Sequence, residues 1–362
     1  MLAAPLIDKG SKKRWIVGLD LLLVLVYAFM GIWILNHEFQ YGLYLAMTLA
    51  VGTISVFYRL AYGAWYPELI PAGFEQKGYA VSGTIYPMII IVMSPAATFL
   101  YEKVSMQNLF FLVAALTMLS VVIESMIEEH RPESKAGCAD AKSQKDSYFF
   151  KQYKADVREG FSYLKKEKGI RNIYTYMSVT QGVSEGTAIA IQAFYQTQPG
   201  LTVTMLGFLK SAEMIGRVLS GALQYRIEIP AKKRYGITKF VYIFYQLADM
   251  LLLFVPYPLM LINRFLCGGL GTMSATLRET AVQSYLPGNI RARVNAVFHV
   301  FFAAGGIFFQ FFAGALGEVL PYRATVLLMG AISLLAIRIF IVKPDRENRP
   351  VYEAIRDEKN KN

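Results

Sequence analysis

The stretch WIVGLDLLLVLVYAFMGIWIL, residues 15–35, decides the class of fold. Its only charged residue is Asp20. An α-helix rises about 1.5 Å per residue, so about 20 apolar residues cross the hydrocarbon core of a bilayer. The run is too long for the apolar part of a signal peptide, and no small-residue cleavage site follows it. It therefore predicts a transmembrane helix.

Nine further windows of similar length and apolar character follow the first one. They are residues 41–63, 79–101, 107–127, 171–195, 203–225, 237–255, 259–283, 294–317 and 321–342. Of the 362 residues, 55% are hydrophobic and 17% are charged, whereas a soluble domain carries about 25% charged residues. This balance excludes a cytosolic enzyme, a disordered protein and a secreted disulfide scaffold. It predicts an all-α polytopic transmembrane bundle with ten spans.

The basic residues are distributed unevenly between alternate loops. The net charge is +11, yet 29 of the 37 Lys and Arg residues fall on one side of the predicted spans and only Lys103 and Arg323 fall on the other. Cytoplasmic loops carry such an excess of basic residues. We therefore expect a multi-pass protein of the cell (plasma) membrane with both termini in the cytoplasm. The basic charge is explained by topology and by the lipid bilayer, and a nucleic-acid partner is not expected.

The spacing of the spans predicts four parts of the chain. These are an N-terminal half-bundle at 1–127, a cytoplasmic linker at 128–170, a C-terminal half-bundle at 171–343 and a cytoplasmic tail at 344–362. Within the linker, apolar residues recur at steps of three and four on one helical face: Phe150, Tyr153, Val157, Phe161 and Leu164. This pattern predicts an amphipathic helix on the cytoplasmic membrane surface.

Two predicted cytoplasmic loops resemble each other. ELIPAGFEQKGYAV at 68–81 aligns with SYLPGNIRARVNAV at 284–297, with Pro71 opposite Pro287 and Lys77 opposite Arg293. The match is either chance similarity of Pro- and Lys-rich loops or an internal repeat of the kind found in transporters. If it is a repeat, the halves should be equal. Four spans precede the linker and six follow it, so two spans are expected to be missing from the front.

The residues AAPLIDKGSKKR at 3–14 carry a family resemblance. They are similar to the pattern G-x-L-x-D-R-x-G-R-[RK] in the loop after the second span of the major facilitator superfamily, in particular of its multidrug and macrolide-type exporters. Asp20 and the segment QSYLPGNIRARVNAV are also similar to this group, whereas MSPAATF at 93–99 lacks the glycines of the antiporter pattern. The resemblance covers nearly the whole chain from the family's third span onward.

The resemblance implies a secondary active transporter that works as a monomer by alternating access. It suggests proton-coupled efflux of small organic molecules or drugs by an antiporter. The acidic and basic positions of the family's cytoplasmic gate fall on Asp8, Lys9, Lys12 and Lys13. A plain positive-inside stub explains the same four residues without a gate.

Six ionisable side chains inside the predicted spans of the second half are candidates for a substrate or proton pathway. They are Glu185, Lys210, Glu213, Arg217, Asp249 and Arg264. A charged side chain in the hydrocarbon core costs about 2.5–3.5 kcal/mol on insertion scales, so each needs a partner or a water-filled cavity.

The sequence leaves the role of each candidate open. Lys210, Glu213 and Arg217 share one helical face and form either a self-neutralising ladder or a cavity-facing site. Glu185 lies between Gly182 and Gly186, whose small size permits close packing or exposure of the carboxylate to a cavity.

The two remaining candidates lie on other predicted spans. Arg264 is expected to hold a counter-charge for Glu213, Glu185 or an anionic substrate. Asp249 is expected to serve mainly in packing, with a direct role as the alternative.

Catalysis finds little support in the sequence. The three histidines and the two cysteines show no metal-ligand or nucleophile pattern, and no Walker loop is present. We therefore expect no enzyme activity, no cofactor and no metal. A non-transporting membrane sensor or remnant, and a polytopic lipid-modifying enzyme, remain as alternatives to a transporter.

Overall fold

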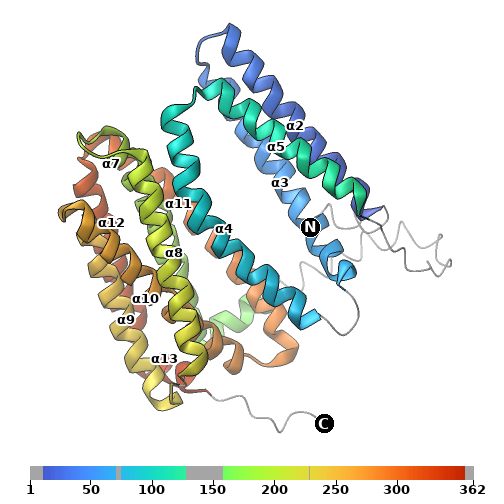
Figure 1. Cartoon of the computed structure of the whole chain (residues 1–362). Helices are drawn as coiled ribbons and strands as arrows, with labels where there is room; N and C mark the ends of the chain where they lie inside the picture. Colours follow the sequence, from blue (N-terminus) through green and yellow to red (C-terminus); the bar gives the residue numbers. More distant parts are fainter. Residues whose placement is uncertain (1–10, 71–74, 128–157, 228, 355–362) are drawn as a thin grey trace, which may run out of the picture. The chain divides into compact units, whose positions relative to one another are not determined.

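The computed structural model describes residues 11–70, 75–127, 158–227 and 229–354. These residues are almost entirely helical and contain no strand, which confirms the all-α fold (Figure 1). The chain forms two compact units. The first contains Met1–Ile89 and Ala96–Gly137, and the second contains Ile90–Pro95 and Cys138–Asn362.

Every predicted span corresponds to a long helix in the described part of the chain. The helices are α2 (Lys12–Asn36), α3 (Tyr41–Leu69), α4 (Glu75–Lys103), α5 (Met106–Met126), α7 (Lys168–Thr197), α8 (Val203–Arg226), α9 (Ala231–Leu251), α10 (Tyr257–Tyr285), α11 (Gly288–Val319) and α12 (Tyr322–Ala336). The sequence did not reveal three shorter elements, namely the 3-10 turn η1 (Leu252–Phe254), the π-helical turn η2 (Ile337–Val342) and the helix α13 (Asp345–Glu353).

Proline marks the start of five helices in the second unit. Pro230, Pro256, Pro287, Pro321 and Pro344 are the N-cap residues of α9, α10, α11, α12 and α13. Proline has no backbone N–H, and its fixed φ suits the beginning of a helix but not its interior. These residues therefore set where each connecting turn ends and the next helix begins.

In the first unit, α2 packs against α5 and α3. Gly31 of α2 lies against the ring of Phe111 in α5, and a side chain at position 31 would overlap that ring. Ile16, Ala61 and Trp65 form a small buried cluster where α2 meets α3. The missing side chain of the glycine thus lets two apolar helices approach closely, as is common in membrane bundles.

In the second unit, two helix pairs cross on glycine residues. Gly182 of α7 and Gly305 of α11 form one crossing, and Gly216 of α8 and Gly268 of α10 form the other. A Cβ at any of these four positions would overlap backbone carbonyl atoms of the facing helix. The backbones therefore approach each other at these points, which leaves α7, α8, α10 and α11 side by side around a common interior.

The four helices differ in how apolar they are. Seven of the described helices are long and apolar enough to cross a membrane by themselves: α2, α3, α4, α5, α9, α11 and α12. The remaining long helices, α7, α8 and α10, carry five of the six predicted intramembrane charges. Because α7 and α8 pack against α11 and α10, polar side chains on these helices can face a protein interior rather than lipid.

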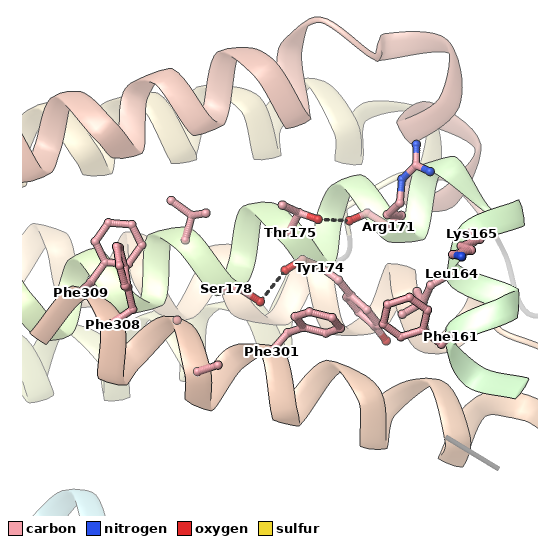
Figure 2. Close-up of a pocket in the computed structure, with 13 residues that line it drawn as sticks. Phe161, Leu164, Lys165, Arg171, Tyr174, Thr175, Ser178, Phe301, Phe308 and Phe309 are labelled. Carbon is pink, nitrogen blue, oxygen red and sulfur yellow. Dashed lines mark hydrogen bonds between the residues drawn. The ribbon is translucent and has the colours of Figure 1, made fainter. Parts of the chain in front are cut away.

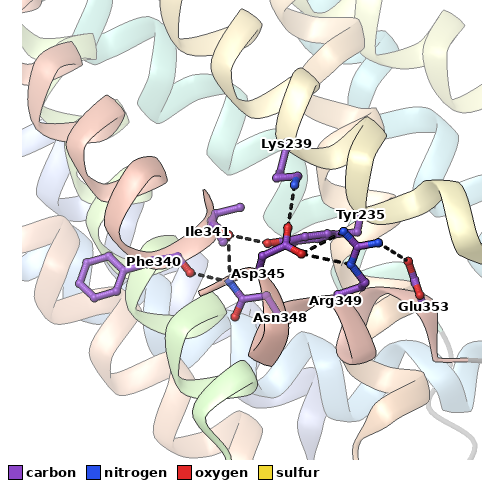
Figure 3. Close-up of polar contacts among 8 residues, drawn as sticks. All are labelled: Tyr235, Lys239, Phe340, Ile341, Asp345, Asn348, Arg349 and Glu353. Atoms are coloured by element: carbon purple, nitrogen blue, oxygen red, sulfur yellow. Dashed lines mark hydrogen bonds and ion pairs between the residues drawn. The ribbon is translucent and has the colours of Figure 1, made fainter. Parts of the chain in front are cut away.

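Hydrogen bonds join α13 to the turn that follows α12 and to the first part of α9 (Figure 3). The π-helical turn η2 widens the end of α12, and Asn348 of α13 donates to the carbonyl oxygens of Phe340 and Ile341 at 2.7 and 3.2 Å. The Tyr235 hydroxyl of α9 donates to the Ile341 oxygen at 2.6 Å. These bonds satisfy carbonyl groups at a helix end that would otherwise be buried without partners.

Candidate functional site

A cavity of about 440 Å³ opens among α7, α8, α10 and α11 in the second unit. Four of the six predicted charged residues line it, namely Glu185, Lys210, Glu213 and Arg264. Apolar side chains from α7 and α8 complete much of the wall. Eight of the thirteen lining residues are polar or charged, so the cavity is more polar than the usual small-molecule site.

A second cavity of about 230 Å³ adjoins the first. It is lined by Arg217 and Asp249, and it shares Gln181 and Ser184 of α7 with the first cavity. All six residues predicted from the sequence therefore line one or the other of two neighbouring cavities. The structure brings together groups from α7, α8, α9 and α10 that are up to 79 positions apart in the sequence.

Glu185 is held by two neutral amides. The side chain of Gln181, one turn earlier on α7, donates to Glu185 Oε1 at 3.1 Å, and the side chain of Gln310 on α11 donates to Oε2 at 2.5 Å. No ion pair to Glu185 is formed by the residues that the structure describes. The carboxylate thus has hydrogen-bond donors but no counter-charge. Uptake of a proton would neutralise it.

Glu213 and Lys210 of α8 have different surroundings. Glu213 Oε1 accepts hydrogen bonds from Arg217 Nη2 at 2.6 Å and Nε at 3.1 Å. Lys210 is exposed on the cavity wall, and its ammonium group forms no ion pair with the described part of the chain. The predicted strip of three charges is therefore one ion pair plus one available cation, rather than a continuous ladder.

Arg264 of α10 pairs with Asp249 of α9. The distance from Nη2 to Oδ1 is 2.6 Å, and the two side chains are 10% and 8% exposed. The counter-charge of Arg264 is thus Asp249, whereas the sequence suggested Glu213, Glu185 or an anionic substrate. A buried pair of this kind is neutral as a unit, so Arg264 can line the first cavity and Asp249 the second without an isolated charge.

The predicted gate residues fall at the start of the described chain. Asp8 and Lys9 lie outside the described residues. Lys12 and Lys13 form the first turn of α2, whose N-cap Ser11 accepts a hydrogen bond from the backbone N–H of Arg14 at 3.2 Å. Basic side chains in a first turn oppose the helix dipole. Their presence there is therefore not explained by helix stability.

Two residues of the site were missed by sequence reasoning. Gln181 and Gln310 are uncharged, so a search for intramembrane charges passes over them. Gln310 does carry a signal, because it is the single polar residue in the run IFFQFF at 307–312. An amide in such a run needs a partner within the bundle, and Glu185 supplies it.

The first unit holds a separate polar group. Asp20 of α2 is 6% exposed, and the Tyr58 hydroxyl of α3 donates to Glu124 Oε1 of α5 at 3.0 Å. Across the described residues, no group of three His, Cys, Asp or Glu side chains is arranged to hold a metal ion.

Apolar helices of bilayer length, an all-helical fold and charged residues around a cavity within the helices define a polytopic membrane protein of the transporter class. The sequence profile of the Major Facilitator Superfamily matches residues 1–248 and 234–360. The chain belongs to the Major Facilitator Superfamily. Membership places it among transporters rather than enzymes.

Solved structures share the fold. One is a bacterial homolog of the human lysosomal transporter Spinster, in an inward-facing and unoccupied conformation, with a TM-score of 0.65 and 12% identity over 97% of this chain and 86% of that one. Another is a POT family transporter in complex with a thioalcohol-conjugated peptide, with a TM-score of 0.62 and 11% identity over 92% of this chain and 82% of that one. No curated protein matches the sequence significantly.

Proposed function

We propose that the protein is a proton-coupled exporter of small organic molecules that works by alternating access. The observation that carries the proposal is the arrangement of Glu185, a carboxylate on a cavity wall with amide donors and no counter-charge. An ionisable group at membrane depth that faces a cavity is a functional-site hypothesis by default.

Glu185 is the stronger of the two proton-carrying candidates. Glu213 already has Arg217 as a counter-charge at 2.6 Å, so protonation of Glu213 would leave that guanidinium unpaired. Protonation of Glu185 breaks no ion pair, because its described partners are the neutral amides of Gln181 and Gln310. The carboxylate can therefore change its charge at a lower cost, which is what a coupling site requires.

The remaining charges suit roles in binding and support. Lys210 offers an ammonium group to a polar or anionic part of a substrate on the same cavity wall. The Arg264–Asp249 pair supports the base of the cavity from α9 and α10. The apolar wall residues suit the apolar body of an organic molecule, and the two compact units are what rigid-body rocking needs.

The proposal includes a topology and a gate. The excess of basic residues on one side supports a plasma-membrane protein whose two termini are cytoplasmic. The cluster that begins α2, Lys12 and Lys13, belongs with Asp8 and Lys9 to the proposed cytoplasmic gate. A basic first turn that opposes the helix dipole supports a role other than helix capping.

The test is a flux assay on the full-length protein in proteoliposomes. The probe is ethidium, a lipophilic organic cation, and efflux is driven by an imposed pH gradient. Glu185→Gln keeps the size of the side chain and one acceptor oxygen, but it cannot take up a proton. We expect it to abolish gradient-driven efflux while ethidium exchange across the membrane continues. Glu213→Gln is also expected to abolish efflux, because it releases Arg217.

The matched control is Glu318→Gln, which removes an exposed carboxylate of α11 that lies outside both cavities. It should leave efflux unchanged. Full gradient-driven efflux in both Glu185→Gln and Glu213→Gln would remove these residues from the pathway. Exchange that is as strongly impaired as efflux in Glu185→Gln would show a structural role and not a coupling role.

A further inference from the structure

An apolar groove of about 470 Å³ lies on the second unit and shares no lining residue with the two charged cavities. It is formed by the helix at 158–166, the first half of α7 and the middle of α11. Figure 2 shows Phe308 and Phe309 toward one end, Phe301 in the middle, and Phe161 toward the other end. The volume lies within the range of about 300–1,000 Å³ that is typical of small-molecule sites.

The two hydroxyl groups in the middle of the groove are not free to donate a hydrogen bond to a ligand. The Thr175 hydroxyl donates to the Arg171 carbonyl oxygen at 2.9 Å, and the Ser178 hydroxyl donates to the Tyr174 carbonyl oxygen at 3.0 Å. Both hydroxyl groups thus donate to carbonyl oxygens of α7 itself. This part of the groove therefore favours a hydrocarbon group as its occupant. A polar group would lose its hydrogen bonds to water there without replacement.

Two basic residues line the same end of the groove. Lys165 and Arg171 line it next to Phe161 and Leu164 (Figure 2). Both side chains are exposed, and neither forms an ion pair with residues in the described ranges. The Lys165 ammonium lies 5.9 Å from the centre of the Phe161 ring.

The neighbouring acidic groups are already engaged. Glu159 Oε2 accepts from Arg293 Nη1 at 2.8 Å, and Glu167 Oε2 accepts from the Tyr285 hydroxyl at 3.0 Å. Among residues 158–171, the basic side chains outnumber the acidic ones. The segment that carries Lys165 and Arg171 therefore has a net positive charge.

We propose that this groove binds one anionic phospholipid, with its phosphate at Lys165 and Arg171 and an acyl chain along the phenylalanines of α11. A molecule with a negative head and a long hydrocarbon body matches both ends of the groove. Basic pockets between transmembrane helices on the cytoplasmic side hold anionic head groups in this manner. The aromatic side chains Phe301 and Phe308 are 46% and 63% exposed, so an acyl chain would cover apolar surface.

The experiment is native mass spectrometry of the purified full-length protein in detergent, titrated with phosphatidylglycerol or phosphatidylcholine of the same chain length. We expect tighter binding of phosphatidylglycerol. The double variant Lys165→Gln/Arg171→Gln should weaken it about 25-fold, since each basic residue near a lipid surface contributes roughly fivefold. The control Lys232→Gln/Lys233→Gln removes the same charge from exposed positions at the start of α9 and should have no effect.

A second pair of variants tests the hydrocarbon part of the groove. Ala304→Trp places a large ring inside the groove, whereas Ala303→Trp places the same ring on the neighbouring exposed position of α11 outside it. We expect only Ala304→Trp to exclude the lipid. An excess of glycerol phosphate should not compete, because the head group alone lacks the acyl contact.

Three results would overturn the proposal. One is equal affinity of the wild-type protein for phosphatidylglycerol and phosphatidylcholine. Another is equal affinity of Lys165→Gln/Arg171→Gln and Lys232→Gln/Lys233→Gln for phosphatidylglycerol. The third is a lack of lipid binding by the wild-type protein, which would show that another part of the chain fills the groove. The assay measures binding and not flux, so its outcome is independent of the proposed transport activity.

Discussion

The buried pair between Arg264 and Asp249 gives the sharpest prediction about stability. Arg264→Met replaces the guanidinium with an apolar side chain of similar length. It leaves Asp249, whose side chain is 8% exposed, without a counter-charge. Breaking a buried pair from one side costs about 3–5 kcal/mol, because an uncompensated charge stays buried. Asp249→Leu should cost a similar amount for the same reason.

The double variant Arg264→Met/Asp249→Leu should recover most of the loss. Replacing both partners with apolar groups removes the two desolvation penalties together, and such replacements are often neutral or stabilising. The expected free energy of unfolding is therefore within about 1–2 kcal/mol of the wild-type value. This gives a large coupling energy in a double-mutant cycle.

The assay is reversible unfolding of the detergent-solubilised protein, followed by circular dichroism as a function of denaturant. Arg217→Met is the matched control, since the Arg217–Glu213 pair has the same 2.6 Å separation but side chains that are 42% and 25% exposed. It should cost about 1 kcal/mol or less. Additive single effects, or an Arg264→Met variant as stable as the control, would refute the argument that burial rather than distance sets the cost.

Two further predictions concern helix crossing and pH. Gly216→Ala should destabilise the protein by about 1–3 kcal/mol, because its Cβ would overlap a carbonyl oxygen of α10. The control is Gly221→Ala on the same helix, whose Cβ would meet no atom within 4 Å. In a thermal melt this control should be neutral or slightly stabilising. The hydrogen bond from Lys239 lowers the pKa of Asp345, so Asp345 stabilises the fold above about pH 4 and loses this effect as the pH falls through the lowered pKa. The Tm difference between wild type and Asp345→Asn should therefore be present at pH 7 and shrink as the pH falls below about 4. A difference that stays constant across this range would contradict the assignment.

The spans were predictable because the bilayer imposes a simple rule. A helix that faces lipid must be apolar over about 20 residues, and that property is local in sequence. The prolines at 256, 287 and 321 likewise mark the starts of α10, α11 and α12, because proline restricts the φ angle of its own residue and has no N–H. Helix α13 escaped prediction because its stretch is polar and its stability comes from buried contacts of Asn348, Val351 and Tyr352 with the bundle.

The candidate site was predictable only in part. Charges in apolar helices stand out in the sequence, so Glu185, Glu213 and Arg264 could be selected as individual residues. Their partners could not, because an ion pair or hydrogen bond between helices depends on which faces meet. Gln310 lies 125 positions from Glu185, and the pairing of Arg264 with Asp249 rather than with Glu213 follows from the turn between α9 and α10.

The sequence by itself determined that this chain is a basic, multi-helix membrane protein, and it determined where its helices lie. These properties follow from composition and periodicity, which each residue carries with it. Only the tertiary structure decided which charges are neutralised by a partner and which remain available. The close crossings at Gly182 and Gly216 bring α7 to α11 and α8 to α10. That packing leaves Glu185 with amides, Lys210 facing the cavity, and an apolar groove that ends at two cations.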